Sequence, residues 1–103
     1  MNSKELCRII KLAIPFKEVE KINQVGKGVY NKQQILEFLK EDIQVGEKTL
    51  EHLKTNVVEQ NDYIEELITS VKNLIESEKN AIEEIQKLGN IQYQFSTEYM
   101  KEV

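Results

Sequence analysis

Apolar side chains recur every seven residues along more than half of this chain, beginning at Leu36. With Leu36 as position a of a heptad, positions a and d stay apolar up to residue 88 except at Gly46, Gln60 and Glu78. A seam sustained over eight heptads is typical of a coiled-coil helix. We therefore predict a helical shaft over residues 32–88 that self-associates through this seam. The predicted self-association residues are Leu36, Leu39, Ile43, Leu50, Leu53, Val57, Ile64, Leu67, Val71, Leu74, Ile85 and Leu88.

Both ends of the shaft carry signals for the ends of a helix. Asn31 is a favoured N-cap, and Gln34, three residues later, completes a capping box with it. Tyr30 and Ile35 flank this cap at the spacing of a hydrophobic staple. The Gly-Asn pair at 89–90 predicts a left-handed stop at the other end.

The shaft is too long to be stable alone. A helix over 32–88 would extend about 85 Å at ~1.5 Å per residue, and its apolar stripe needs a partner surface. Either the shaft stays straight and pairs with a second chain, or the chain folds back near 59–62 or 76–80, where polar residues cluster. Because neither Gly nor Pro occurs between Gly46 and Gly89, we favour the straight shaft.

The stripe widens in the second half of the shaft. After residue 61 the e positions are Ile68, Ile75 and Ile82, so three positions per heptad are apolar. A strict two-stranded coiled coil needs only a and d, whereas a wider face suits a bundle. We expect more than one helix to cover the shaft.

Three seam positions depart from the pattern. Gly46 can permit a bend or the close approach of another helix. Gln60 and Glu78 are polar, and buried polar seam residues weaken association while selecting register and oligomeric state. The alternative is that the seam is locally exposed at these positions.

The first 28 residues predict two short helices. Residues 3–14 carry one apolar stripe, with Ser3 as the candidate N-cap. Pro15 cannot continue that helix but suits the first turn of the next, which ends before the Gly-Lys-Gly at 26–28.

The last residues fit two structures. Ile91, Tyr93 and Phe95 alternate like a strand, yet Ile91, Phe95 and Tyr99 also share one helical face. Because Ser96 can cap the residues that follow it, we prefer a short terminal helix.

Composition limits the class of protein. The chain has 103 residues, of which 40% are hydrophobic and 31% charged, with four Gly and one Pro. One Cys and one His exclude an internal disulfide and a zinc site built from these residues. No apolar run approaches the ~20 residues of a membrane span, and the charged N-terminus is unlike a signal peptide. We expect a soluble cytoplasmic protein.

Charge is distributed unevenly. Residues 1–33 contain seven Lys or Arg and three acids, a net +4, whereas the remainder has a net −8. The basic segment could meet an acidic partner or nucleic acid, or it could pair with the acidic shaft. The candidates for contact with an acidic partner are Lys4, Arg8, Lys11, Lys17 and Lys21.

No catalytic signature stands out. His52 reads as a surface residue of the shaft, and Cys7 as a small buried hydrophobic residue. Acidic pairs such as Glu65-Glu66 fall on outward heptad positions. A catalytic carboxylate pair needs burial to shift its pKa, and the pattern offers none. We predict no enzymatic activity, no cofactor and no metal.

One family is similar in outline. The run "LCRIIKLAIPFKEVEKI", a loop and the long heptad helix resemble the second half of MerR-type transcriptional regulators over residues 5–60. "PFKEVEKI" looks like the short helix before the dimerisation helix of that family. The resemblance implies antiparallel dimer contacts at Leu50, Leu53, Val57 and Ile64. The winged DNA-reading part of the family is missing.

Together these patterns predict an all-α protein with one helical domain, residues 1–103. Its parts are a basic helical head (1–28), a coiled-coil shaft (32–88) and a C-terminal tail (89–103). Our leading interpretation is a non-enzymatic module that forms homodimers and binds another protein as an assembly, regulatory or inhibitory component. The alternative is a DNA-associated regulator of the MerR dimerisation type.

Overall fold

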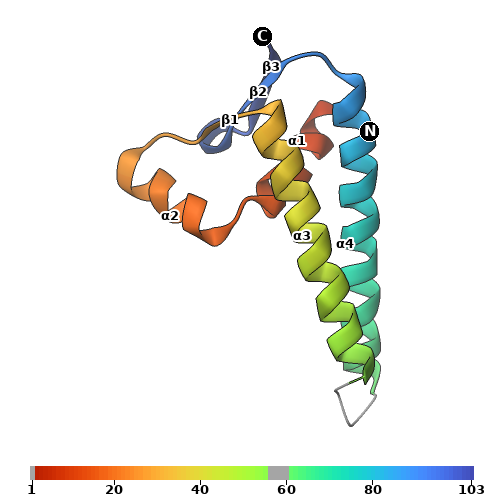
Figure 1. The fold of residues 1–103 in the computed structure, drawn as a ribbon. Coiled ribbons are helices and arrows are strands. Elements are labelled where there is room, and N and C mark those ends of the chain that lie inside the picture. Colours follow the sequence, from red (N-terminus) through yellow and green to blue (C-terminus); the bar gives the residue numbers. More distant parts are fainter. Residues whose placement is uncertain (1, 56–60) are drawn as a thin grey trace.

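The computed structural model describes residues 2–55 and 61–103 (Figure 1). Helices dominate it, as predicted, but the all-α prediction was wrong, because the described residues also form a three-stranded antiparallel sheet. In chain order the elements are α1 (Ser3–Ala13), α2 (Phe16–Val25), β1 (Val29–Asn31), α3 (Lys32–Thr55), α4 (Asp62–Lys87), β2 (Ile91–Gln94), the 3-10 turn η1 (Phe95–Thr97) and β3 (Tyr99–Glu102).

The predicted shaft is two helices that lie side by side and run in opposite directions (Figure 1). α3 ends at Thr55, and α4 begins after the N-cap Asn61, whose side chain accepts the Ile64 N–H at 3.0 Å. The straight shaft was therefore wrong and the hairpin alternative is confirmed. Asn is one of the strongest N-capping residues, and it starts a new helix here without any Gly or Pro.

The turn predicted at 76–80 lies inside α4, so the chain does not reverse there. Val57 and Gln60, to which we assigned seam positions, lie outside the described residues. The hairpin buries the seam within one chain and so removes the need for a second chain to cover all of it.

The capping box at the start of α3 forms as predicted. The Gln34 N–H donates to Asn31 Oδ1 at 2.9 Å, and the Asn31 N–H donates to Gln34 Oε1 at 3.0 Å. Tyr30 and Ile35, on either side of the cap, are both buried. These contacts place the start of α3 directly after β1.

The two N-terminal helices form close to their predicted positions. The N-cap of α1 is Asn2 rather than Ser3, since Asn2 Oδ1 accepts the Glu5 N–H at 2.8 Å. Pro15 stands at the N-cap of α2, and Gly26 ends that helix with a φ of 71°, a left-handed conformation that Gly adopts at little cost.

The tail forms strands, so the preferred terminal helix was wrong. Ile91 and Tyr93 point inward and are buried, as the period-two alternation allows. β2 pairs with β1 on one side and with β3 on the other. The left-handed stop predicted at 89–90 is also wrong, because α4 ends with Leu88 in an extended conformation.

The core lies where α1, the sheet and the adjoining ends of α3 and α4 meet (Figure 1). The side chains of Ile10, Ile35, Leu39, Ile85 and Tyr93 are each less than 2% exposed. Toward the other end of the hairpin, most seam side chains are only half-buried. The molecule therefore combines a well-packed base with a long, partly covered pair of helices.

Candidate functional site

The structure divides the predicted self-association residues into two groups. Those near the base are buried within the chain and belong to its own core or inner seam: Leu36, Leu39, Ile43 and Ile85, together with Leu53 farther out. The others are half-buried, and we call the five of them that lie beyond Gly46 the distal seam: Leu50, Ile64, Leu67, Val71 and Leu74. Leu88, near the base, is also half-buried.

The distal seam has further apolar surface around it. Tyr63 on α4 is 68% exposed, and Val45 on α3 is 60% exposed. Leu50 and Ile75 form the apolar floor of a shallow pocket of about 320 Å³ between the helices, and charged side chains surround it. Apolar floor and charged rim are the usual components of a protein–protein contact surface.

At Gly46 the two helices of the seam approach each other closely. A Cβ atom at Gly46 would lie 2.9 Å from Cγ1 of Ile75, nearer than real Cβ atoms come to such neighbours. Of the two roles predicted for Gly46, the close approach of another helix is the one observed. Gly46 thus fixes the spacing between α3 and α4 just before the distal seam.

Glu78 is the most unusual residue of the seam. Its side chain is completely buried on α4. As a carboxylate, it has no hydrogen-bond donor for either oxygen among the described residues. Burial first, and then the nearby Asp42 carboxyl on α3, raise the pKa of Glu78 to about 8. A proton on Glu78 would supply the donor that a carboxyl–carboxylate pair needs.

This pair contradicts our expectation that the sequence provides no burial for a pair of carboxyl groups. The heptad pattern placed Glu78 in the seam, so its burial was one of two open alternatives. Asp42 had no such signal, because only the hairpin brings residue 42 of α3 next to residue 78 of α4. At neutral pH the neutral form of Glu78 is favoured.

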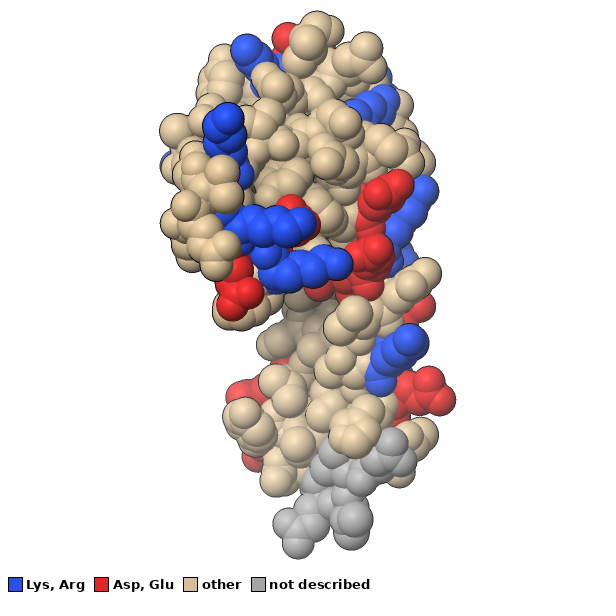
Figure 2. Space-filling model, turned by 60° about the vertical axis from the view of Figure 1, so that its left-hand side comes forward, with Lys and Arg blue, Asp and Glu red and all other residues tan. Residues whose placement is uncertain are grey.

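Asp42 also lines a groove of about 270 Å³ between the α1–α2 joint and α3, which we call the acid groove. Its apolar wall includes Pro15 and the aromatic rings of Phe16 and Phe38, and Phe16 is 76% exposed. The complete lining is Ala13, Ile14, Pro15, Phe16, Phe38, Glu41, Asp42 and Val45. The molecule narrows below the head, and acidic and basic side chains gather at that level (Figure 2).

The predicted basic residues lie on two helices. Lys4, Arg8 and Lys11 follow one another at helical spacing along the exposed side of α1. Lys4 and Arg8 line a pocket of about 240 Å³ that Glu5 and Glu98 also line, so the pocket has charges of both signs. Lys11 pairs with Glu98 at 2.5 Å and lies 5.5 Å from the centre of the Phe95 ring.

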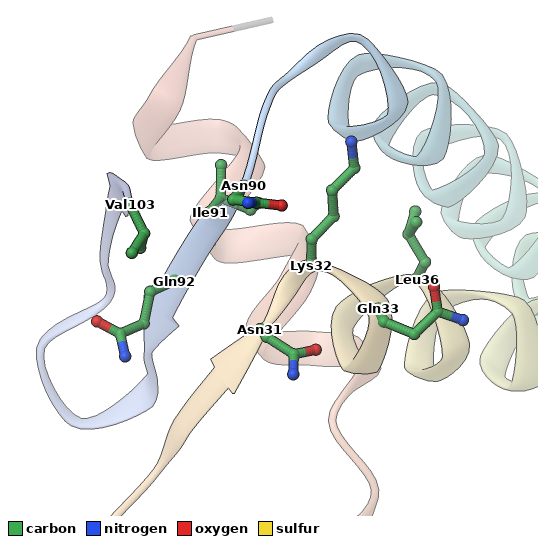
Figure 3. Close-up of a pocket in the computed structure, with 8 residues that line it drawn as sticks. All are labelled: Asn31, Lys32, Gln33, Leu36, Asn90, Ile91, Gln92 and Val103. Carbon is green, nitrogen blue, oxygen red and sulfur yellow. The ribbon is translucent and has the colours of Figure 1, made fainter.

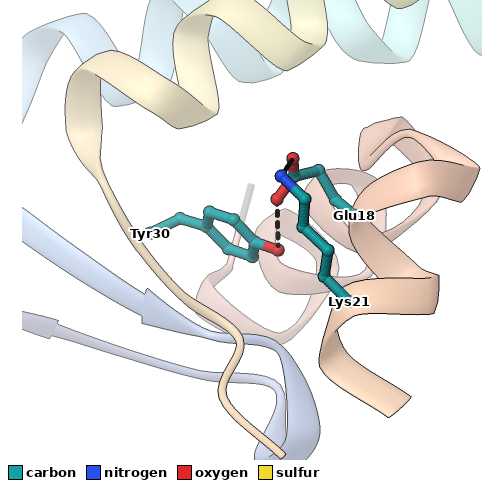
Figure 4. A network of polar contacts seen from close by, with 3 residues as sticks. All are labelled: Glu18, Lys21 and Tyr30. Atoms are coloured by element: carbon teal, nitrogen blue, oxygen red, sulfur yellow. Dashed lines mark hydrogen bonds and ion pairs between the residues drawn. The ribbon is translucent and has the colours of Figure 1, made fainter. Parts of the chain in front are cut away.

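The other two basic residues, Lys17 and Lys21, belong to α2 and are exposed. Lys21 pairs with Glu18 at 3.2 Å, and the Tyr30 hydroxyl donates to the same carboxylate at 3.4 Å (Figure 4). This network ties α2 to β1. Part of the basic head is thus used in contacts within the chain.

A pocket of about 480 Å³ lies beside the end of the sheet (Figure 3). Amide and apolar side chains dominate its wall, including Asn31, Gln92 and Leu36. Lys32 lines it too, but its Nζ donates to the carbonyl oxygen of Leu88 at 2.5 Å. Lys32 therefore caps the C-terminal end of α4, and the pocket holds no arrangement of acid and base.

Two candidates for chemistry remain, Cys7 and His52. Cys7 is buried, and burial raises the pKa of its thiol, which keeps it protonated. His52 is exposed on α3, as predicted. Within residues 2–55 and 61–103, no three His, Cys, Asp or Glu side chains are grouped so that they could hold a metal ion.

The comparisons with known proteins returned no match to a family model, to a curated protein or to a solved structure. In the described part of the chain, no helix is both long enough and apolar enough to cross a membrane.

Proposed function

We propose that this chain is a non-enzymatic protein-interaction module that self-associates through the distal half of its helical hairpin. The observation that carries the proposal is the contrast along one seam. Near the base, Leu39 and Ile85 are completely buried, whereas beyond Gly46 the five side chains of the distal seam remain half-buried.

Two helices are too few to cover the stripe of α4. Ile68, at an e position, is half-buried like its neighbours Leu67 and Val71, so the apolar face is wider than one partner helix can cover. Near the base, α1 supplies the third helix, since it packs on both α3 and α4. No described third helix covers the distal seam. There, a second hairpin would provide the missing helices and complete a four-helix bundle.

The charges around the distal seam suit such an assembly. Lys79 and Glu47 pair across the hairpin at 3.7 Å, and Lys72 and Glu76 lie on the rim of the same pocket. Both signs therefore occur beside the apolar floor. Charged rims of mixed sign set register and orientation between helices more than they add affinity.

Light scattering coupled to gel filtration tests self-association directly. The proposal requires a mass of at least twice the 12.1 kDa of one chain. On dilution this mass should fall toward 12.1 kDa, because the chains dissociate. A mass of one chain at every concentration, up to about 1 mM, would contradict it.

The basic row on α1 supports the alternative of a DNA-associated regulator less well. Glu5 and Glu98 share a pocket with Lys4 and Arg8, and Lys11 is paired with Glu98. Phosphate recognition needs positive charge that is free to replace counterions. If the protein slows duplex DNA in a gel mobility-shift assay, and added salt weakens that binding, the result would favour this alternative over the protein-interaction module.

A further inference from the structure

The acid groove contains negative charge and exposed apolar surface but lacks a cation. We propose that it binds a Lys or Arg side chain from a partner protein, with the apolar part of that segment packed against Phe16 and Phe38. This inference concerns a surface separate from the distal seam and does not depend on self-association.

The Asp42–Glu78 pair is the first observation that points to a cation. Buried carboxyl groups in folded proteins nearly always have a hydrogen-bonding or charged partner. Among the described residues, Glu78 has no partner of opposite charge: its neighbour across the hairpin is Asp42, another carboxyl group, and the two can share a hydrogen bond only while one of them holds a proton. A guanidinium or ammonium group at Asp42 would provide several donors and neutralise the charge of the pair.

Within residues 2–55 and 61–103, no cation of the chain pairs with these carboxyl groups. The ion pairs formed by described residues join Lys11 with Glu98, Lys21 with Glu18, Lys79 with Glu47 and Lys87 with Glu84. None of them involves Glu41, Asp42 or Glu78. Glu41 and Asp42, the two acidic residues that line the groove, are therefore open to a cation from outside.

The apolar wall indicates which kind of cation fits. Phe16 and Val45 are 76% and 60% exposed, and both line the groove beside Asp42. The stems of Lys and Arg pack well on such surface while their charged ends reach a carboxylate. Arg can also stack on an aromatic ring, which Phe16 or Phe38 would provide.

Binding at this site is coupled to a proton on Glu78. The groups that face Glu78 and the groove are Asp42 and Glu41 from α3, while the α1–α2 joint contributes the apolar Ile14, Pro15 and Phe16. A cation at Asp42 favours the charged form of Glu78 and hence the release of its proton. Affinity should therefore rise as pH rises toward and past the pKa of Glu78.

A small analogue of the Arg side chain tests the proposal in the full chain. Amide chemical shifts would be followed while n-butylguanidinium is added, with n-butylurea as the neutral isostere. We expect n-butylguanidinium to shift amides of residues 13–16 and 38–45 and to bind at least about tenfold more tightly than n-butylurea. Its affinity should rise on the order of tenfold between pH 7 and pH 9, because Glu78 titrates near pH 8.

Variants locate the effect. Asp42→Asn should weaken n-butylguanidinium binding about tenfold or more. Glu78→Gln should abolish the pH dependence of that binding. Glu83→Gln changes an exposed acid on the same helix as Glu78 and should alter neither the affinity nor its pH dependence. Equal binding of the two analogues, shifts confined to other residues, or an unchanged pH dependence in Glu78→Gln would overturn the proposal. A loss of dimer mass in Asp42→Asn would overturn it as well, since the occupant would then be a second copy of the chain.

Discussion

Gly46 of α3 and Ile75 of α4 approach so closely that a Cβ atom on Gly46 would lie 2.9 Å from Ile75 Cγ1 and 3.0 Å from Ile75 Cδ1. The heptad pattern alone treats Gly46 as a defect, because Gly contributes nothing to an apolar seam and weakens a helix. In the hairpin, the missing side chain makes room for Ile75, which is buried there. The glycine that interrupts the heptad pattern therefore serves the packing of α3 against Ile75 of α4.

The first prediction follows from this contact. Gly46→Val places methyl groups where Ile75 lies, and overpacking of this kind costs about 1–3 kcal/mol of the free energy of unfolding. Urea unfolding followed by circular dichroism measures the loss. Adding Ile75→Ala to Gly46→Val should recover part of it, since the smaller side chain makes room.

Gly89→Val is the matched control for Gly46→Val. A Cβ atom at Gly89 would meet nothing within 4 Å, and its φ is not in the left-handed region. Its stability should therefore change by no more than about 0.5 kcal/mol. Equal losses at both glycines would mean that backbone flexibility, and not contact with Ile75, explains the effect.

The second prediction concerns pH and stability. The pKa of Glu78 rises from 4.5 to about 8 on folding, so the folded chain holds a proton that the unfolded chain releases between these values. The contribution of this proton to the free energy of unfolding is therefore fully present below about pH 4.5, and it is lost as pH rises through 8. The slope should be on the order of 1 kcal/mol per pH unit between these values.

Thermal unfolding from pH 5 to pH 9 measures this slope. Glu78→Gln should flatten it and make the protein more stable above pH 7, because the amide stays neutral in both states, whereas the Glu78 carboxyl group ionises on unfolding and so favours the unfolded chain. Glu83→Gln should keep the slope of the original chain, since that side chain is exposed. Identical slopes in all three proteins would remove Glu78 as the origin.

The third prediction compares two buried tyrosines. The Tyr93 hydroxyl is buried without a hydrogen-bond partner among the described residues, whereas the Tyr30 hydroxyl donates to Glu18. Tyr93→Phe should leave the free energy of unfolding unchanged or raise it by up to about 1 kcal/mol. Tyr30→Phe should lower it by about 0.5 kcal/mol, because the bond it removes is long. A larger loss for Tyr93→Phe than for Tyr30→Phe would contradict this assignment.

The fourth prediction concerns the capping box. Asn31→Ala removes the acceptor of the Gln34 N–H at the start of α3 and should cost about 1 kcal/mol. Gln44→Ala, an exposed position inside the same helix, should change stability by less than about 0.5 kcal/mol. The same unfolding experiment compares the two, and similar losses would show that the cap does not stabilise α3.

The features that were predicted correctly are those with local causes. The capping box at Asn31 and Gln34 lies within four residues, and the stop at Gly26 depends on that residue's own backbone. The two short N-terminal helices likewise follow from apolar spacing and from Pro15. Such signals act before any tertiary contact forms, so they can be read from the sequence.

The features that were missed depend on partners distant in sequence. Residues 92–94, with Tyr93 at their centre, form a strand because residues 29–31 pair with them, about sixty positions earlier in the chain. The heptad pattern continues across the polar segment near Asn61, so periodicity alone could not separate a straight helix from a hairpin. Asp42 and Glu78 become neighbours only in the hairpin, so periodicity alone could not predict this pair either.

The mass of the Leu67→Asp variant tests the central claim most directly. Leu67 belongs to the distal seam, and a second hairpin would bury an aspartate there without a partner of opposite charge, at a cost of several kcal/mol. We predict that Leu67→Asp has the mass of a single chain by light scattering, while its circular dichroism spectrum still shows the helix content of the original protein. Thr69→Ala, an exposed change on the same helix, should keep the mass of the original protein. A Leu67→Asp protein that retains at least twice the mass of one chain would contradict the account.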